Sequence, residues 1–494
     1  MVAVSGLVYE LIAGAAASYL LGDSVTQFSL VIGIFLTSMG VGAFLSRFVD
    51  SAEKGFATSQ IALGLVGGFS APILFATYAW LQGVGGVLFA IVFLTGALSG
   101  LEIPLITRIL TGLGAGRHTL ANVLTADYLG ALVAAVAFPL FIIPQLGLMS
   151  ASLAFGLMNL IVAGVSLWIF REQLGWAFRI VWVLALVACS VALVRAEALV
   201  SVLDSTLYED EVILSETTPY QQITVTRFRD RTRLFLNQSI QFDTLDEHRY
   251  HEMLVHPALA RVARPSRVLI LGGGDGMAAR EVLRDGRVEQ IDLVDLDPRV
   301  TELFRDRDDL AALNDGSLRD PRVTIHAVDA WNFVSDGAEP YDLIIADLPD
   351  PATLALSKLY TREFYARVMD MLSSAGIFVT QAGSPLFARE AFWSIEETLS
   401  ATRNPSSPSA GLWTETLNVT IPSFGIWGFV LAAPLGRAEY DLDLPEGLKY
   451  LTQDTFDAAR VFPPDMSRLD VEPNTMQTHI LARYYLEGWD RWFR

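Results

Sequence analysis

The chain has 494 residues, of which 52% are hydrophobic, and its 54 acidic and 35 basic residues give a formal net charge of −19. We predict no nucleic-acid partner for so acidic a chain. Its single cysteine, Cys189, excludes a disulfide framework.

The first 200 residues are overwhelmingly apolar, whereas most acidic residues lie after Asp204. Because the apolar runs repeat and no short charged leader or small-residue cleavage site precedes them, a secretory signal peptide is a poor explanation. We predict a transmembrane domain of about seven helices over residues 1–203, with the lipid bilayer as partner and a multi-pass position in the cell (inner) membrane. The runs of spanning length lie near residues 2–21, 27–48, 57–81, 84–107, 121–143, 147–170 and 175–200.

Two stretches of this half, residues 5–11 and 99–105, both begin Ser-Gly-Leu. A true repeat would make two three-helix units of inverted topology, and chance similarity between helices rich in small residues explains the pattern equally well. Glu10, Glu102 and Asp127 lie within or at the ends of apolar runs, where an unpaired carboxylate is costly. We favour local pairing that fastens helices, with partners such as Tyr9, Asn122, Thr107 or Arg108, over a cation site.

The orientation signals conflict. Basic residues fall in the loops after the second, fourth and sixth apolar runs, and the positive-inside rule places these loops in the cytoplasm. With seven spans, the domain after the seventh run then faces outward. The seventh run is the weakest, since Arg179 and Arg195 flank its uncharged core, and a position in the membrane interface without crossing would remove the conflict. The loop residues that carry the signal are Arg47, Lys54, Arg108, Arg117 and Arg171.

After the apolar half the pattern changes to strands. Apolar and polar residues alternate from 211 to about 236, which predicts an antiparallel β unit in a small domain, 204–260, that covers a crevice. From 261 to about 433 strand and helix patterns alternate, which predicts a parallel sheet with helices on both faces. The fold class is therefore a transmembrane helical bundle followed by an α/β Rossmann-like (methyltransferase-like) domain, 261–434. A tail, 435–494, ends in an aromatic-rich helix near 484–493.

A glycine-rich turn follows the first strand of the α/β domain. The apolar run 268–271 leads into Gly272-Gly-Gly-Asp-Gly276, and such a turn lets a ligand approach the backbone at the carboxyl end of a parallel strand. Gly272 and Gly274 are therefore candidate ligand-binding residues. Asp295 ends the next apolar run, at the spacing where a carboxylate binds ribose hydroxyls. Together these features predict an adenosine-type ligand.

Carboxylates line the predicted crevice. Asp275 lies where a phosphate-binding loop keeps its donors free of negative charge, and no Gly-Lys-Ser/Thr follows. The strand pattern 341–347 ends with Asp347, and Asp350 comes three residues later. With Asp295 and Asp329 these acids predict a positively charged substrate, and we predict neither a metal site nor a resident cofactor.

At these residues the sequence resembles the spermidine synthases, a family of polyamine aminopropyltransferases, over roughly residues 220–429. The resemblance is dense because several motifs occur in the same order. They are Tyr220-Gln221 with Ile223 and Val225, the segment Asp246-Glu-His-Arg-Tyr-His-Glu252, the glycine loop with Arg280-Glu281 after it, and Asp347-Leu-Pro-Asp-Pro351 in place of Asp-Ser-Ser-Asp-Pro.

The resemblance implies transfer of the aminopropyl group of decarboxylated S-adenosylmethionine, a co-substrate, to putrescine or a related amine, giving spermidine and methylthioadenosine. The attacking amine has a solution pKa of about 10, near that of lysine, so the site needs a base. By resemblance Asp347 is this catalytic base and Asp350 anchors the distal ammonium. A turn-capping role for Asp350 is the alternative.

The resemblance also assigns the remaining pocket residues. It places Asp275 on the donor's ammonium, Asp295 on its ribose and Asp329 near its adenine amino group, although an aspartate at that position is also common in turns. Structural hydrogen bonding is the alternative for His251. The residues that then line the donor and acceptor pockets are Gln221, Gln241, Tyr250 and His251.

Several positions depart from the family pattern. Leu236-Asn-Gln replaces Leu-Asp-Gly, Asp295 replaces a glutamate, and Leu348-Pro349 replaces Ser-Ser. In the segment 421–429, two residues shorter than its family counterpart, Phe424 cannot supply the phenol of the family's tyrosine. The donor is therefore better supported than putrescine as acceptor.

Two other functions remain open: another S-adenosylmethionine-dependent enzyme (a methyltransferase, an aminocarboxypropyl transferase or a lyase), and a polyamine transporter or sensor. The acid pair Asp347 and Asp350 favours aminopropyl transfer, because methyl transfer needs no such pair. We expect a cytoplasmic catalytic domain, since the donor pool is cytosolic, and a homo-oligomer, most simply a dimer.

Overall fold

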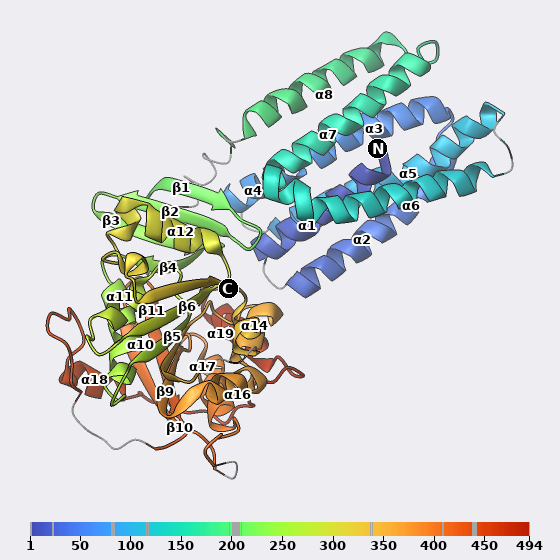
Figure 1. Cartoon of the computed structure of the whole chain (residues 1–494). Helices are drawn as coiled ribbons and strands as arrows, with labels where there is room; N and C mark the ends of the chain where they lie inside the picture. The colour runs from blue at the N-terminus through green and yellow to red at the C-terminus, as the bar shows by residue number, and fades with distance from the viewer. Residues whose placement is uncertain are drawn as a thin grey trace. The chain divides into compact units, whose positions relative to one another are not determined.

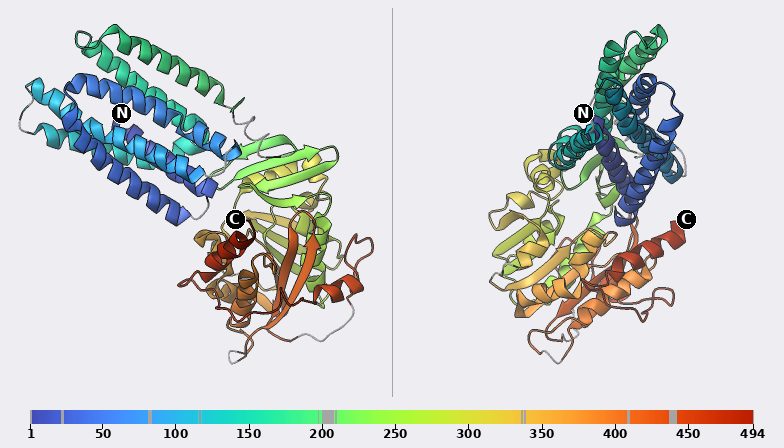
Figure 2. Two further views of the ribbon diagram at one scale, coloured as in Figure 1. Left: turned by 180° about the vertical axis from the view of Figure 1, so that it is seen from behind. Right: turned by 90° about the vertical axis from the view of Figure 1, so that its right-hand side faces the viewer.

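The computed structural model describes residues 2–493 apart from gaps at 22–23, 81–83, 115, 117, 197, 200–207, 209, 336, 338, 408–409 and 437–441. The chain divides into two compact units, Met1–Val212 and Ile213–Arg494. Figures 1 and 2 show that the first is built from helices and the second contains the sheets.

The first unit is a bundle of long apolar helices. Among the described residues, five helical stretches are long and apolar enough to cross a membrane, namely Thr26–Phe48, Ala52–Tyr78, Val84–Gly112, Thr119–Ile169 and Trp176–Val194. A shorter apolar helix covers Val4–Ser18. The elements are α1 (Val2–Leu21), α2 (Ser24–Leu45), η1 (Ser46–Phe48), α3 (Ala52–Gly68), α4 (Ser70–Trp80), α5 (Val84–Gly112), α6 (Thr119–Ala137), η2 (Phe138–Ile142), α7 (Ile143–Ile169) and α8 (Trp176–Val194).

The stretch Thr119–Ile169 is broken in its middle. A straight helix of 51 residues would be about 76 Å long, more than twice the roughly 30 Å of a bilayer's hydrocarbon core. Gly147 leaves helical geometry with φ of 66° and ψ of 174°, and a π-helical turn, η2, precedes α7. The stretch therefore provides two segments of spanning length, and seven crossings stay a prediction.

The last apolar run, expected to be the weakest, forms a helix long and apolar enough to cross a membrane. Helix α8 has a mean hydropathy of 2.4 over its most apolar window, the highest of the five candidates. Its 19 residues make a helix of about 28 Å, close to the thickness of the hydrocarbon core. Arg179 lies in its first turn, so the apolar part that follows is uninterrupted.

Helices α2 and α5 pack closely through small residues. A Cβ atom on Gly42 would lie 1.9 Å from the Ala97 carbonyl oxygen, and one on Gly100 would lie 2.1 Å from that of Met39. Any larger side chain at either glycine would force the two backbones apart. Close backbone contact of this kind is a main source of helix association in a bilayer, where burial from water contributes little.

The buried carboxylate Glu102 has a hydrogen-bond partner on another helix. Gln60 Nε2 of α3 donates to Glu102 Oε1 of α5 at 2.5 Å, and Asn159 Nδ2 of α7 donates to the Tyr9 hydroxyl of α1 at 2.9 Å. The partners expected for Glu102 from its sequence neighbours were wrong: Arg108 instead donates to backbone carbonyls of residues 46, 49 and 50. The Gln60 bond supports the fastening role.

Replacing Glu102 by alanine is expected to lower the melting temperature while catalysis by the second unit persists. The change strands the amide donor of Gln60 in an apolar interior, and such interhelical bonds contribute about 0.6 kcal/mol on average. Differential scanning fluorimetry measures the shift, with Glu10→Gln, at a half-buried position, as the milder comparison. Polyamine flux in proteoliposomes that disappears in Glu102→Gln at unchanged melting temperature would instead support a cation site.

The second unit begins with the expected antiparallel β unit. Its four strands pair in the order β1-β2-β3-β4, and tight turns join β2 to β3 and β3 to β4, so neighbours in sequence are neighbours in the sheet. The strands are β1 (Glu211–Thr217), β2 (Gln222–Phe228), β3 (Arg231–Leu236) and β4 (Ser239–Asp243).

A seven-stranded sheet follows in the order β10-β11-β9-β8-β5-β6-β7. Its five strands from β5 to β9 are parallel, but β11 is antiparallel to both of its neighbours, β9 and β10, so the expectation of an entirely parallel sheet is corrected to a mixed one. A short turn joins these two strands, and only antiparallel strands can be connected without a crossover. The strands are β5 (Arg267–Gly272), β6 (Gln290–Asp295), β7 (Val323–Ala327), β8 (Tyr341–Asp347), β9 (Leu372–Gln381), β10 (Trp413–Ile421) and β11 (Gly425–Ala433).

Helices cover both faces of this sheet (Figure 1). Along β5, Val268 and Ile270 belong to one buried cluster, and Leu269 and Leu271 to another, as alternation on a strand requires. The helices are α10 (Glu247–Leu259), α11 (Met277–Leu283), α12 (Pro298–Asp306), α13 (Asp308–Ala311), η3 (Ser317–Arg319), α14 (Ala330–Ser335), α15 (Leu354–Ser357), η4 (Lys358–Tyr360), α16 (Arg362–Asp370), α17 (Arg389–Ser400), α18 (Gln453–Ala459) and α19 (Ile480–Phe493).

Candidate active site

The glycine loop lies directly against the end of β8. Gly272 is in register with Asp347, has a φ of +83°, and a Cβ atom there would lie 2.0 Å from the Asp347 carbonyl oxygen. Only glycine fits such a position, because a side chain would be both strained and in collision. Gly273 N then donates to the same carbonyl oxygen at 3.2 Å. The loop and the acidic strand end therefore form one edge of the sheet.

Two carboxylates lie at this loop, Asp275 within it and Asp295 beside it. Asp275 is buried and its Oδ1 accepts from Met277 N at 2.9 Å, while Asp295 Oδ2 accepts from Gly274 N at 3.0 Å. A Cβ atom on Gly274 would lie 2.6 Å from Asp295 Oδ2, so this contact also needs glycine. Burial raises the pKa of Asp275 and the pKa of Asp295 each to about 6.

Asp347 is held by a phenol from α10. The hydroxyl of the buried Tyr250 donates to Asp347 Oδ1 at 2.7 Å. Burial raises the pKa of Asp347 above its ordinary value, although His251 and this hydrogen bond act in the opposite direction. A carboxylate with a raised pKa holds a proton more readily, which suits a general base.

Behind Asp347 lies a buried chain of charges. His251 Nδ1 is 2.8 Å from Glu247 Oε2, and Arg280 Nη2 is 2.8 Å from the same oxygen. Burial acts to lower the pKa of His251, but the Glu247 carboxylate outweighs it and the pKa is raised. Burial likewise acts to raise the pKa of Glu247, yet His251 and Arg280 bring it down to about 2. These links tie His251 firmly to Glu247.

Asp350 is held on both oxygens. Tyr485, from α19 near the C-terminus, donates its hydroxyl to Oδ2 at 2.6 Å, and Gln381 Nε2, at the end of β9, lies 3.3 Å from Oδ1. Gln381 Nε2 also lies 2.6 Å from the Tyr360 hydroxyl. Burial raises the pKa of Asp350 to about 6, against the two hydrogen bonds.

Sequence reasoning missed both partners of Asp350. A signal existed for Gln381, because a polar residue ends a buried strand that lies beside β8, at the same edge as Asp347. No comparable signal existed for Tyr485, which lies 135 residues from Asp350 in a tail without clear periodicity.

Three other expected pocket residues have hydrogen-bond or ion-pair partners within the protein. Gln221 Nε2 donates to Asp297 Oδ2 at 3.1 Å, and Gln241 Nε2 donates to the Ser239 carbonyl within its own strand at 3.1 Å. Asp329 pairs with Lys358 at 2.8 Å and caps the start of α14 through Trp331 N. The structure therefore brings together Asp275, Asp295, Asp347, Asp350, Tyr250 and His251, with Gly272 and Gly274 beneath them.

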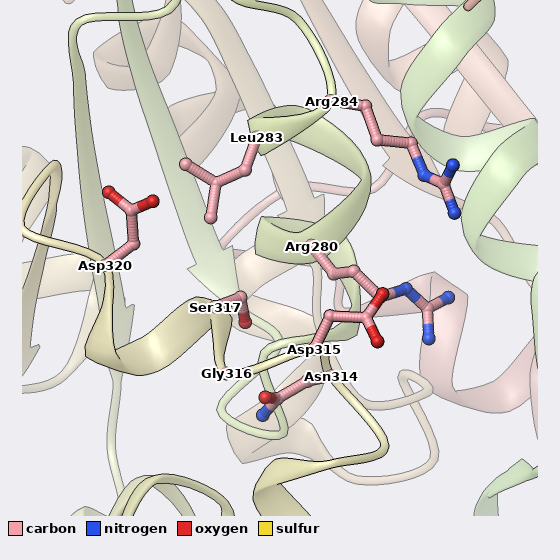
Figure 3. Close-up of a pocket in the computed structure, with 8 residues that line it drawn as sticks. All are labelled: Arg280, Leu283, Arg284, Asn314, Asp315, Gly316, Ser317 and Asp320. Atoms are coloured by element: carbon pink, nitrogen blue, oxygen red, sulfur yellow. The ribbon is translucent and has the colours of Figure 1, made fainter. Parts of the chain in front are cut away.

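A separate surface pocket of about 300 Å³ lies beside α11 (Figure 3). Arg280 and Arg284 contribute to its lining, and both pair with Glu281 at 2.8 Å. Both arginines therefore already have an ion-pair partner in the protein. None of the four crevice acids, Asp275, Asp295, Asp347 and Asp350, lines it.

The four crevice acids Asp275, Asp295, Asp347 and Asp350 form no ion pair with any other residue in the described part of the chain. Buried carboxylates without cationic partners favour a ligand that brings its own positive charge. A glycine loop at the carboxyl edge of a Rossmann-like sheet, with an acid at the end of the next strand, suits an adenosine moiety. Fold and site together define a transferase-like enzyme for a cationic adenosyl substrate.

Comparison with known proteins identifies the family. A family model of the spermine/spermidine synthase domain matches residues 247–433. The chain is 41% identical to the polyamine aminopropyltransferase of Leptospira interrogans, over 98% of this chain and 96% of the relative. It is 42% identical to polyamine aminopropyltransferase 2 of Ralstonia nicotianae, over 99% and 96%, and 39% identical to the polyamine aminopropyltransferase of Oceanobacillus iheyensis, over 100% and 96%.

The solved spermidine synthase from Thermotoga maritima aligns with 28% identity and a TM-score of 0.46, over 51% of this chain and 84% of that one. The near full-length relatives include the apolar helices as well as the α/β unit. The chain belongs to the polyamine aminopropyltransferase family.

Proposed function

We propose that the enzyme transfers the aminopropyl group of decarboxylated S-adenosylmethionine to putrescine or a related diamine, giving spermidine and methylthioadenosine. The observation that carries the proposal is the acid pair Asp347 and Asp350, each held by a tyrosine hydroxyl. Both carboxylates have raised pKa values, and neither forms an ion pair in the described part of the chain. A diamine supplies two nitrogens for two acids.

In the proposed reaction, Asp350 holds the distal ammonium of the diamine and Asp347 accepts a proton from the near one. The neutral amine nitrogen then attacks the aminopropyl methylene, a C–N bond forms, and the C–S bond breaks. Its electron pair returns to sulfur, which becomes the neutral thioether of methylthioadenosine. Asp347 passes its proton on to solvent after the product amine forms.

The donor is proposed to lie over the glycine loop, with its ammonium on Asp275 and its ribose hydroxyls on Asp295. The hydrogen bonds from Gly274 N and Asp297 N support this role of Asp295, because they hold its carboxylate at the edge of the loop. The adenine amino group is assigned to Asp329. Its Oδ2 accepts a hydrogen bond from the Lys358 ammonium.

Mass spectrometry of the reaction products tests this proposal. Purified full-length protein is given decarboxylated S-adenosylmethionine with putrescine, cadaverine or spermidine, and in parallel reactions the carboxylated form. With the decarboxylated form, methylthioadenosine and an aminopropylated amine are expected, which is spermidine when putrescine is the acceptor. A methylated or cyclised product from S-adenosylmethionine would instead indicate another enzyme on the same fold.

The catalytic unit is proposed to face the cytoplasm, where the donor is expected, and to act as a dimer. Cysteine labelling tests the sidedness, because Cys189 is the only cysteine to remove. Cysteines placed at Asp308, whose side chain is 93% exposed, and at the exposed Glu172 between α7 and α8 are treated with an impermeant maleimide from either side. Labelling of both from one side would mean that α8 does not cross. Light scattering in detergent measures the oligomeric state.

A further inference from the structure

The C-terminal helix α19 contributes to the site through Tyr485. Its hydroxyl lies 2.6 Å from Asp350 Oδ2, and its ring lies beside Gly383, where an added Cβ atom would be 3.9 Å from Tyr485 Cε2 and 4.0 Å from Asp350 Oδ1. Gly383 itself has a φ of +67°. The tyrosine, the aspartate and this glycine turn are thus immediate neighbours.

Helix α19 is held in place by specific contacts. Before it, the buried Asn474 donates from Nδ2 to the carbonyl oxygens of Ser357 and Tyr360 at 3.0 and 3.1 Å. Along it, a Cβ atom on Gly488 would lie 2.6 Å from Ala388 Cα, so the helix rests directly on the backbone there. Contacts this close restrict the movement of the helix that carries Tyr485.

The tyrosine hydroxyl on Asp350 comes from α19, because Phe424 in the hairpin β10–β11 carries no phenol. Phe424, at the turn between β10 and β11, packs its ring 6.0 Å from Tyr250 and 5.4 Å from Trp427, measured between centroids. A phenol that donates to a carboxylate stabilises its charge and fixes its orientation. Unlike an arginine, it does not neutralise that charge. The negative charge of Asp350 therefore stays available to an ammonium ligand.

We infer that Tyr485 is a positioning residue of the acceptor site, and that α19 forms the wall of that site behind Asp350. The inference rests on the proposed function, in which Asp350 anchors the distal ammonium of the diamine. Tyr485 acts through Asp350: its hydroxyl fixes one oxygen while Gln381 fixes the other. The C-terminal tail is thereby part of the catalytic unit.

Tyr485→Phe is expected to raise the KM for the diamine by about 10- to 100-fold, the range for a hydrogen bond to a charged group. The affinity for the adenosyl donor is expected to change less than about twofold, because the donor acids lie at the glycine loop. A structural role alone would instead lower both affinities together, along with the melting temperature.

A pH profile separates positioning from simple loss of contact. The Tyr485 hydrogen bond lowers the pKa of Asp350, which burial has raised to about 6. Its removal raises that pKa further, so more of Asp350 is neutral near pH 7. The protonation part of the defect in diamine KM should therefore be largest at about pH 6 and below, and should shrink as pH rises to about 8.5, where Asp350 is ionised in both proteins.

Two further variants control the experiment. Tyr484→Phe removes the adjacent hydroxyl on the same helix and is expected to leave the diamine KM unchanged. The Tyr484 ring faces Arg483, whose Cζ lies 5.7 Å from the ring centroid. Gly488→Ala pushes α19 off residue 388 and is expected to reproduce the Tyr485→Phe defect. A diamine KM within about twofold of wild type in folded Tyr485→Phe would overturn the inference.

The inference and the proposed function fail in different ways. Product formation by the wild-type enzyme tests the reaction alone. Titration of the Asp350 carboxyl by ¹³C NMR in substrate-free protein tests the Tyr485 bond without any turnover, and a rise in its pKa in Tyr485→Phe is expected. An unchanged pKa would remove the positioning role even if spermidine is made.

Discussion

Asp347→Asn is expected to abolish most turnover while donor binding stays nearly intact. Loss of a general base typically costs about 10²–10⁴-fold in rate. Asparagine keeps an oxygen that accepts the Tyr250 hydroxyl, now 2.7 Å from Asp347 Oδ1, so the shape of the site is preserved. Only the ability to accept the amine proton is lost.

Single-turnover kinetics and calorimetry measure the two properties separately. Asp350→Asn is the matched comparison, since the same chemical change at the anchor should raise the diamine KM more than it lowers kcat. Lost donor binding with unchanged turnover per bound donor in Asp347→Asn would make the base assignment wrong. In the wild type, activity should fall as pH drops and Asp347, whose pKa is raised by burial, becomes protonated.

The catalytic edge was predictable because strand ends converge. In a parallel sheet the carboxyl ends of the strands meet at one edge, so the glycine loop at the end of β5, Asp295 at the end of β6 and Asp347 at the end of β8 were expected together. The structure places them there: Gly272 is in register with Asp347, and Gly274 N bonds to Asp295. Local pattern and topology were sufficient for these residues.

The two strands at the end of the sheet were misjudged for a local reason. A parallel sheet was expected over residues 261–433, but the direction of the strands at 413–421 and 425–433 depends on the connection between them. The turn at 422–424 is too short for a crossover helix, and this alone makes the pair antiparallel. Weighing the length of that connection would have given the mixed sheet.

Side chains whose partners are far apart in sequence were not predictable. Tyr485 reaches Asp350 only because Asn474 and the Gly488 contact fix α19 in the folded chain. Glu102 likewise pairs with Gln60, 42 residues away on another helix, and not with its sequence neighbours. Such pairs depend on packing, for which neither periodicity nor composition gives a signal.

The donor pocket is expected to bind decarboxylated S-adenosylmethionine about 100-fold more tightly than S-adenosylmethionine itself. In the carboxylated form, the carbon that carries the ammonium also carries the carboxylate, so an ammonium bound to Asp275 brings a second negative charge next to it. Two like charges about 4 Å apart repel by about 4 kcal/mol at an effective dielectric constant of 20. The raised pKa of His251, which favours its cationic form nearby, offsets part of this.

Calorimetry with both ligands measures the preference, and its pH dependence identifies the residue responsible. Burial has raised the pKa of Asp275 to about 6 in the free protein, so the carboxylate loses its charge as pH falls through that value. Below it the cationic donor should bind more weakly, and the preference over the carboxylated form should shrink, because both the attraction and the repulsion depend on the same charge.

Asp275→Asn should reduce the preference at neutral pH in the same way. Asp315→Asn is the matched control, since Asp315 is exposed, lies in the separate pocket of Figure 3 and has a φ of 54°, which asparagine tolerates. The control should bind both ligands like the wild type. If S-adenosylmethionine bound more tightly than its decarboxylated form, the aminopropyl donor would be excluded, because Asp275 would then face a carboxylate that the site accepts.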